Sequence, residues 1–225
     1  MKNIAIIVAG GSGMRFGGEI PKQFIEVGGK PIIIHSMEAF DRHAEIGNII
    51  AVCQPGHMRL LRRQTEEYGI RKLLTIAEAG LTRRKSVLSG LKAVNDKDAI
   101  VLIHDAARPL VSERIISDNI IAATECGAAV TAITAVDTMF ISQDGTYAEG
   151  PLQRGGLYCA QTPQSFRFKI IMDAHISAGS ADVTDDCQLV LAAGHKVAIV
   201  EGSELNFKVT TPVDLDRFRS VLGIQ

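Results

Sequence analysis

A glycine-rich segment near the start of the chain contains the first residues whose types and spacing could do chemistry. It reads Ala9-Gly10-Gly11-Ser12-Gly13-Met14-Arg15 and is followed by Pro21-Lys22-Gln23-Phe24. Glycines after a strand let backbone N–H groups approach phosphate oxygens. Arg15 and Lys22 could then place two cations around one triphosphate. We interpret the segment as a phosphate-binding loop, the alternative being a tight turn with surface charges.

Two familiar phosphate loops are excluded. A P-loop needs Gly-Lys-Ser/Thr, whereas Glu19 and Ile20 follow Gly18. A dinucleotide-binding turn needs a third glycine where Phe16 stands, and the second predicted strand ends in Cys53-Gln54 without an acidic residue for a ribose. A phosphate bound here would therefore be held in another way.

A second candidate is His104-Asp105-Ala106-Ala107-Arg108-Pro109, which follows the most apolar predicted strand, at 99–103. Ligands of open α/β sheets bind at the carboxyl ends of the strands. Asp105 could hold a metal-bound phosphate there, since Mg²⁺ prefers carboxylate oxygens and water. The alternative is an Asp–Arg pair that braces the loop. We interpret His104 as a packed histidine; the sequence has no zinc-type ligand spacing and no G-x-S-x-G nucleophile turn.

Three further segments are polar where a core is expected. They are residues 80–86, 161–164 and 206–212. A capped turn or a basic helix start explains any one of them, and Thr184-Asp185-Asp186 is interpreted first as a helix cap. None of these segments indicates a site by itself.

The elements that must position these residues alternate between strand and helix. Apolar runs predict strands at 4–8, 49–53, 73–77 and 99–103, and helical spacing predicts helices at 31–40, 55–68, 84–94 and 112–126. Ser112 is the expected N-cap of the last helix and Gly127 its end. This alternation predicts an α/β fold with a mostly parallel sheet.

The pattern changes after residue 128. A strand is expected at 128–135, followed by a polar hairpin around 143–145 within an arm of about 137–154 that returns at residue 157. Helices at 167–178, 185–193 and 213–222 and strands at 196–200 and 207–210 complete the prediction. We expect a single domain, 1–225, with a protruding β-arm.

Composition limits the function classes. The 225 residues are 46% hydrophobic with a formal net charge of −1, so bulk positive charge does not hold this chain to nucleic acid. No apolar run approaches the roughly 20 residues of a membrane span. Four scattered cysteines without a CxxC pair favour a reduced, cytoplasmic setting.

Taken in order, these motifs resemble one family. The two N-terminal motifs, Ser86-Val87, Asp105-Ala106-Ala107-Arg108-Pro109, Asp137-Thr138, Gln161-Thr162-Pro163-Gln164 and Lys208-Val209-Thr210 are together similar to those of the 2-C-methyl-D-erythritol 4-phosphate cytidylyltransferases of non-mevalonate isoprenoid synthesis. The resemblance implies a Rossmann-like nucleotidyltransferase fold with a mixed, mostly parallel sheet. It also implies a homodimer whose β-arms are exchanged.

The resemblance also implies roles for individual residues. Arg15 and Lys22 would stabilise the transition state, and Asp105 would hold Mg²⁺. Residues expected to contact CTP are Ala9, Gly10, Gly11, Ser12, Gly13, Gly80, Arg83, Ser86, Asp105 and Ala106. Residues expected to hold the sugar-alcohol phosphate are Arg108, Thr138, Arg154, Thr162, Thr184 and Lys208, with Thr138 and Arg154 coming from the other subunit.

The acceptor is the open point. Ribitol-5-phosphate cytidylyltransferases, a sister family, share Ala-Gly-Gly, Pro-Lys-Gln-Phe and Gln-Thr-Pro-Gln-Ser-Phe with this chain, whereas Leu81 and Phe140 depart from what is common in the first family. Ala107 stands where the ribitol enzymes usually carry valine, which favours methylerythritol phosphate. A CTP-binding regulator without turnover is the alternative from another class.

The implied reaction fits the residues present. A substrate phosphate is already an anionic nucleophile, so it can attack the α-phosphate of CTP in line without a general base, and pyrophosphate leaves. The difficulty is the negative charge crowded around one phosphorus, which cations relieve.

Overall fold

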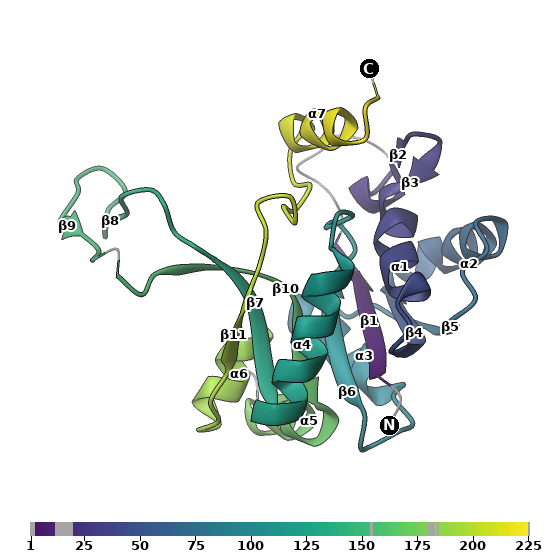
Figure 1. The fold of residues 1–225 in the computed structure, drawn as a ribbon, viewed down its shortest axis with the longest axis horizontal. Helices are drawn as coiled ribbons and strands as arrows, with labels where there is room; N and C mark the ends of the chain where they lie inside the picture. The colour runs from purple at the N-terminus through teal and green to yellow at the C-terminus, as the bar shows by residue number, and fades with distance from the viewer. Residues whose placement is uncertain (1–2, 12–19, 154, 180–182, 184, 225) are drawn as a thin grey trace.

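The computed structural model describes residues 3–11, 20–153, 155–179, 183 and 185–224. Its main sheet has seven strands in the order β11-β7-β10-β6-β1-β4-β5 (Figure 1). The strands are β1 (Asn3–Ala9), β4 (Ile46–Cys53), β5 (Leu73–Glu78), β6 (Ile100–Asp105), β7 (Ala128–Thr134), β10 (Tyr158–Arg167) and β11 (Ala198–Glu201). All pairs are parallel except those of β10, which runs antiparallel to β6 and β7. The predicted mixed, mostly parallel sheet is confirmed.

Helices cover both faces of this sheet, as the apolar strands require. One core joins α1 (Ile32–Arg42), α2 (Met58–Glu67) and α4 (Glu113–Cys126) to the first face. The second core joins α3 (Arg83–Lys92), α5 (Phe168–Ser177) and α6 (Asp186–Ala192) to the other (Figure 1). α7 (Pro212–Val221) packs in a smaller cluster with Val27, Ile32 and Val209. Within the described residues, no helix combines the length and apolar character needed to cross a bilayer.

Local signals set the helix ends near the site. Ser112 accepts a hydrogen bond from the N–H of Ile115 at 3.3 Å and caps α4, which ends at Gly127 with φ +88°. Thr82 caps α3 in the same way, accepting from the N–H of Lys85 at 3.2 Å. The predicted cap and stop of α4 are therefore confirmed.

The segment after β7 leaves the sheet. β8 (Phe140–Ile141) pairs antiparallel with β9 (Gly150–Pro151), and this hairpin extends away from the body of the molecule (Figure 1). It lies within the 137–154 range expected for the arm. The remaining short elements are η2 (Lys22–Phe24), η3 (Pro55–His57) and the β2 (Glu26–Val27) and β3 (Lys30–Pro31) pair.

One strand was not predicted, and one predicted strand is wrong. No strand was predicted between 157 and 167, yet the polar residues 161–164 lie in β10 and are buried. The strand predicted at 207–210 is wrong, because these residues have no regular structure. There the N–H of Val209 bonds to the carbonyl of Ala107 at 2.8 Å, and the Val209 side chain packs beside Phe218 of α7.

Candidate active site

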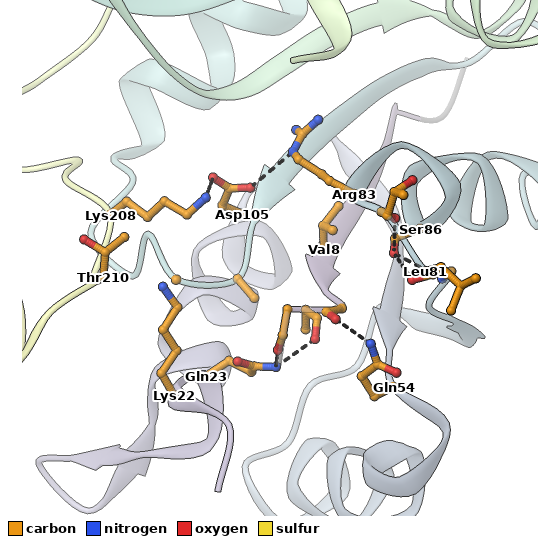
Figure 2. Close-up of a pocket in the computed structure, with 17 residues that line it drawn as sticks. Val8, Lys22, Gln23, Gln54, Leu81, Arg83, Ser86, Asp105, Lys208 and Thr210 are labelled. Atoms are coloured by element: carbon orange, nitrogen blue, oxygen red, sulfur yellow. Dashed lines mark hydrogen bonds and ion pairs between the residues drawn. The ribbon is translucent and has the colours of Figure 1, made fainter. Parts of the chain in front are cut away.

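A cleft of about 720 Å³ lies at the carboxyl ends of β1 and β6. From β1 the sheet continues to β4 and β5 on one side, and the chain then crosses back to β6 on the other side of β1. The strand order therefore reverses between β1 and β6, the arrangement in which open α/β sheets bind ligands. Lys22 and the segment of Lys208 and Thr210 form one wall, and residues 80–83 and Ser86 form the other (Figure 2). The two candidate loops of the sequence therefore meet in one cleft.

Glycine is required where the first loop passes α3. A Cβ at Gly10 would lie 2.9 Å from both the Ala79 Cβ and the Ser86 Oγ, and a Cβ at Gly80 would overlap Lys85. Ser86 Oγ accepts a hydrogen bond from the Gly80 N–H at 3.1 Å. The predicted nucleotide contacts Gly10, Gly80 and Ser86 are thus packed together, which brings both backbones close to the cleft.

Two glutamines that the sequence analysis did not assign hold this loop. Gln23 Nε2 donates to the carbonyl of Ala9 at 2.8 Å and to that of Gly11 at 3.0 Å. Gln54 Nε2 donates to the carbonyl of Gly10 at 2.6 Å. The register that pairs Ala9 with Cys53 places Gln54 beside Gly10, so the position of Gln54 after a parallel strand was the available signal.

Lys22 crosses one end of the cleft. Pro21 precedes the short helix η2, and the Lys22 Nζ donates to the carbonyl of Val209 at 2.7 Å. This contact joins two segments 187 residues apart and brings Lys22 beside Lys208 and Thr210, as a group acting on phosphate requires.

Asp105 lies at the end of β6 among three cations. Its Oδ2 is 2.9 Å from Lys208 Nζ and 3.6 Å from Arg108 Nε, and its Oδ1 is 3.9 Å from Arg83 Nε. Burial alone would raise the pKa of Asp105, but Lys208, Arg83 and Arg108 hold that pKa well below the usual range of a carboxyl group. Asp105 is therefore ionised at neutral pH. The Asp–Arg pair considered from the sequence is present, with Lys208 in addition.

Arg83 is held by a second carboxylate besides Asp105. Its Nη1 lies 2.6 Å from Asp186 Oδ2, and Asp186, almost fully buried, also faces His175 Nε2 at 3.2 Å. Asp185 caps α6 by accepting from the N–H of Cys187 at 2.8 Å, so the capping interpretation of this segment is confirmed for Asp185.

His104 and Thr162 hold the backbone at Asp105 in place. Burial lowers the pKa of His104 to about 4, and its Nε2 contacts the carbonyl of Arg108 at 3.0 Å. The Thr162 hydroxyl accepts from the N–H of Asp105 at 3.1 Å and lies 3.0 Å from His104 Nδ1. His104 is a neutral, packed histidine as expected. Thr162, expected on the substrate side, is buried and positions Asp105.

The cleft fits a magnesium ion that arrives with a triphosphate. Asp105 is the one carboxylate among the described residues that line it, and in that part of the chain no three His, Cys, Asp or Glu residues group as a metal site. Mg²⁺ commonly takes one or two carboxylates and fills its shell with water and substrate phosphates. Asp105 is the residue that would hold it.

Of the predicted site residues, the cleft lining includes Ala9, Gly10, Gly11, Lys22, Gly80, Arg83, Ser86, Asp105, Ala106 and Lys208. Arg108 lies just outside it, paired with Asp105. Thr138 is exposed in the segment between β7 and β8 and is not among the residues that line the cleft. Ser12, Gly13, Arg15, Arg154 and Thr184 lie outside the described residues.

A mixed α/β sheet of this topology, with a glycine turn and converging cations at its carboxyl edge, defines a nucleotidyltransferase. A family model of 2-C-methyl-D-erythritol 4-phosphate cytidylyltransferase matches residues 3–223. The chain belongs to this family of CTP-dependent cytidylyltransferases.

Two similar proteins are methylerythritol enzymes, and a third is a ribitol-phosphate enzyme. The 2-C-methyl-D-erythritol 4-phosphate cytidylyltransferase of Alkaliphilus oremlandii is 42% identical over 217 residues, covering 95% of this chain and 92% of the relative. The 4-diphosphocytidyl-2C-methyl-D-erythritol synthase structure from Anaerococcus prevotii superimposes with a TM-score of 0.86 at 32% identity, covering 99% of this chain and 96% of its own. A ribitol-5-phosphate cytidylyltransferase of Lacticaseibacillus paracasei is 36% identical over 226 residues, covering 97% of both chains.

Proposed function

We propose that this enzyme transfers the cytidylyl group of CTP to the phosphate of 2-C-methyl-D-erythritol 4-phosphate and releases pyrophosphate. The observation that carries the proposal is the charge of the cleft. Among its described lining residues, Lys22, Arg83 and Lys208 are cations and Asp105 is the single carboxylate. A cleft of this kind suits a reaction in which two anionic phosphates meet. Family membership supports the choice of CTP as donor.

In this mechanism the chain supplies charge and position. The acceptor phosphate is already ionised, so no side chain has to remove a proton from it. His104, buried with a pKa of about 4, is neutral and has no part in the transfer. Lys22 would stabilise the charge that develops at the α-phosphate, together with Arg15. When bound at Asp105, Mg²⁺ would neutralise phosphate charge and orient the triphosphate.

The acceptor would lie near Lys208 and Arg108. The Lys208 ammonium is partly exposed and points toward Asp105 in the cleft (Figure 2). An incoming phosphate could displace the Asp105 carboxylate from Lys208 and bind the ammonium group through its own oxygens. Thr138 and Arg154 would complete the pocket from a second subunit.

We also propose a homodimer with exchanged arms, in the cytoplasm. Phe140, Ile141 and Tyr147 of the arm are 60%, 48% and 75% exposed, and an isolated two-stranded hairpin is marginally stable in water. A second copy of the chain would cover these side chains. Four free thiols, Cys53, Cys126, Cys159 and Cys187, fit a reducing compartment.

Ribitol 5-phosphate is the second candidate acceptor, favoured by the relative from Lacticaseibacillus paracasei. One assay separates the candidates: pyrophosphate release with CTP and Mg²⁺, with methylerythritol 4-phosphate and ribitol 5-phosphate in parallel reactions. We expect a higher kcat/KM with methylerythritol 4-phosphate. A preference for ribitol 5-phosphate would reassign the acceptor, and binding of CTP without turnover of either would favour a regulator.

A further inference from the structure

We propose that Gln23 and Gln54 are positioning residues, which hold three successive carbonyl groups of the glycine loop away from the triphosphate. The proposal rests on the proposed function, because it takes the loop as the phosphate site. Both glutamines line the cleft, but their proposed role needs no contact with the nucleotide. They act through the backbone of Ala9, Gly10 and Gly11.

Three successive carbonyl groups of this loop each have a side-chain donor. The carbonyls of Ala9, Gly10 and Gly11 accept hydrogen bonds of 2.8, 2.6 and 3.0 Å from side-chain amides. Both amide hydrogens of Gln23 are used, and the residue is 4% exposed. Figure 2 shows the two glutamines meeting the loop from different elements, η2 and the end of β4.

The physical reason is the sign of the peptide dipole. A backbone carbonyl that faces a phosphate repels it, whereas an N–H group attracts it. A glycine loop can rotate its peptides with little steric resistance, so its carbonyls need partners if the N–H groups are to stay available. A donor fixed on the protein side supplies that partner before the nucleotide arrives, which lowers the ordering cost of binding.

Gln23 also links this loop to the catalytic lysine. Lys22 and Gln23 are consecutive residues of η2, whose turn is closed by the hydrogen bond from the Phe24 N–H to the Pro21 carbonyl at 2.9 Å. A shift of Gln23 would therefore move Lys22, whereas Gln54 lies on a separate element. The two residues should differ in the kinetic constant that they affect.

The test uses Gln23→Met and Gln54→Met, which keep side-chain length and remove the donors. Gln64→Met is the matched control, since Gln64 is a buried glutamine of α2 that lies outside the cleft lining. Binding of CTP and of inorganic tripolyphosphate is measured by calorimetry at one Mg²⁺ concentration, and binding of cytidine is measured in the same way as the phosphate-free comparison. Turnover gives kcat and KM for CTP, and thermal unfolding reports folding.

We expect Gln54→Met to weaken CTP and tripolyphosphate binding alike, by about fivefold to tenfold for one released carbonyl, with kcat within about twofold of the parent. Gln23→Met should weaken both further and lower kcat as well. Cytidine binding and the control should not change. If Gln23→Met does not fold, Gln54→Met decides.

Three results would overturn the inference. They are unchanged tripolyphosphate binding in the folded variants, an equal loss for cytidine and tripolyphosphate, and an equal loss in Gln64→Met. A parent protein that binds neither CTP nor tripolyphosphate would instead contradict the proposed function, which keeps the two failures distinguishable.

Discussion

At the scale of single residues, the cleft separates charges that act on phosphate from charges that hold the protein together. Arg83 is bound on one side by Asp186 and on the other by Asp105, whereas Lys22 reaches a backbone carbonyl. A carbonyl is a weaker partner for an ammonium group than a carboxylate. The contact between Lys22 and the Val209 carbonyl is therefore easier to exchange for a bound phosphate than the carboxylate contacts of Arg83.

Lys22→Ala should abolish turnover and leave the protein folded. Loss of one transition-state contact costs on the order of 10²–10³ in rate, and the deleted ammonium donates to the Val209 carbonyl at the cleft edge. Pyrophosphate release and thermal unfolding measure the two effects. Lys22→Arg should not restore the parental rate, since a planar fork does not replace a compact ammonium. A Lys22→Ala rate within about threefold of the parent, far less than one lost contact costs, would remove Lys22 from the mechanism.

Asp105→Asn should affect magnesium more than nucleotide. We expect about tenfold more Mg²⁺ for half-maximal activity, by comparison with lost metal-supporting groups, and a smaller change in CTP binding without metal. The neutral amide also leaves Lys208, Arg83 and Arg108 without their shared anion, so the melting temperature is recorded alongside. A parental Mg²⁺ titration with a lowered melting temperature would mean that Asp105 only braces its loop.

At the scale of elements, the carboxyl end of β6 depends on a histidine that stays neutral. His104 has an ordinary pKa of 6.5 in the unfolded chain and about 4 in the fold, where burial disfavours the imidazolium. The unfolded state therefore binds a proton at a higher pH than the native state. Its contribution to stability is full above pH 6.5 and is lost as the pH falls toward 4.

This difference predicts a loss of about 3 kcal/mol in unfolding free energy from His104 between pH 7.5 and 4. In His104→Gln the loss over the same interval should be smaller than the parent's by about that amount. Denaturant titrations of both proteins across this pH range measure it. Parallel pH curves would show that His104 titrates normally in the fold.

Helices and strands with apolar runs could be predicted from the sequence. A strand whose buried polar side chains have hydrogen-bond partners elsewhere in the fold could not. β1 and β6 appear in the sequence as unbroken apolar segments, because both faces of a central parallel strand are covered. β10 does not, since Thr162 and Gln164 are buried with partners far along the chain, Asp105 and Asp185. The alternation at 207–210 resembled a strand because Val209 faces a core, although that core belongs to α7.

The same reasoning applies to the site. Glycines and cations indicated a phosphate cleft because their chemistry is visible in the residue type. Gln23 and Gln54 were not assigned, since their partners are backbone carbonyls that only the strand register brings near. The Asp186 support of Arg83 comes from a residue 103 positions away, for which the sequence has no local signal.

At the scale of the whole molecule, the arm sets the proposed assembly. If arms are exchanged, Arg154 serves the partner's cleft while Lys22 serves its own. Lys22→Ala and Arg154→Ala chains should each be nearly inactive. After subunit exchange, half the dimers are mixed and each has one intact site, so activity should approach about a quarter of the parent's by symmetry.

In that experiment, size-exclusion chromatography of mixed, labelled chains shows whether the subunits have exchanged. Exchange without recovered activity would mean that the arm folds back on its own subunit. A Tyr147→Ala arm variant is not a suitable control, because it could alter dimerisation itself. Mixing Lys22→Ala with Lys22→Ala is the matched negative control.

The contacts of Val209 predict how this protein responds to the loss of its C-terminal helix, α7. Its carbonyl receives Lys22, its N–H is fixed to Ala107, and its side chain is buried against Leu215 and Phe218. A stop codon just after residue 212 removes that apolar support while leaving every residue of the described cleft lining in the gene. In such a truncated product the Val209 carbonyl would no longer hold Lys22 in position, and we expect catalysis to be lost. Nonsense mutations in the last helix would therefore have the genetic effect of active-site mutations.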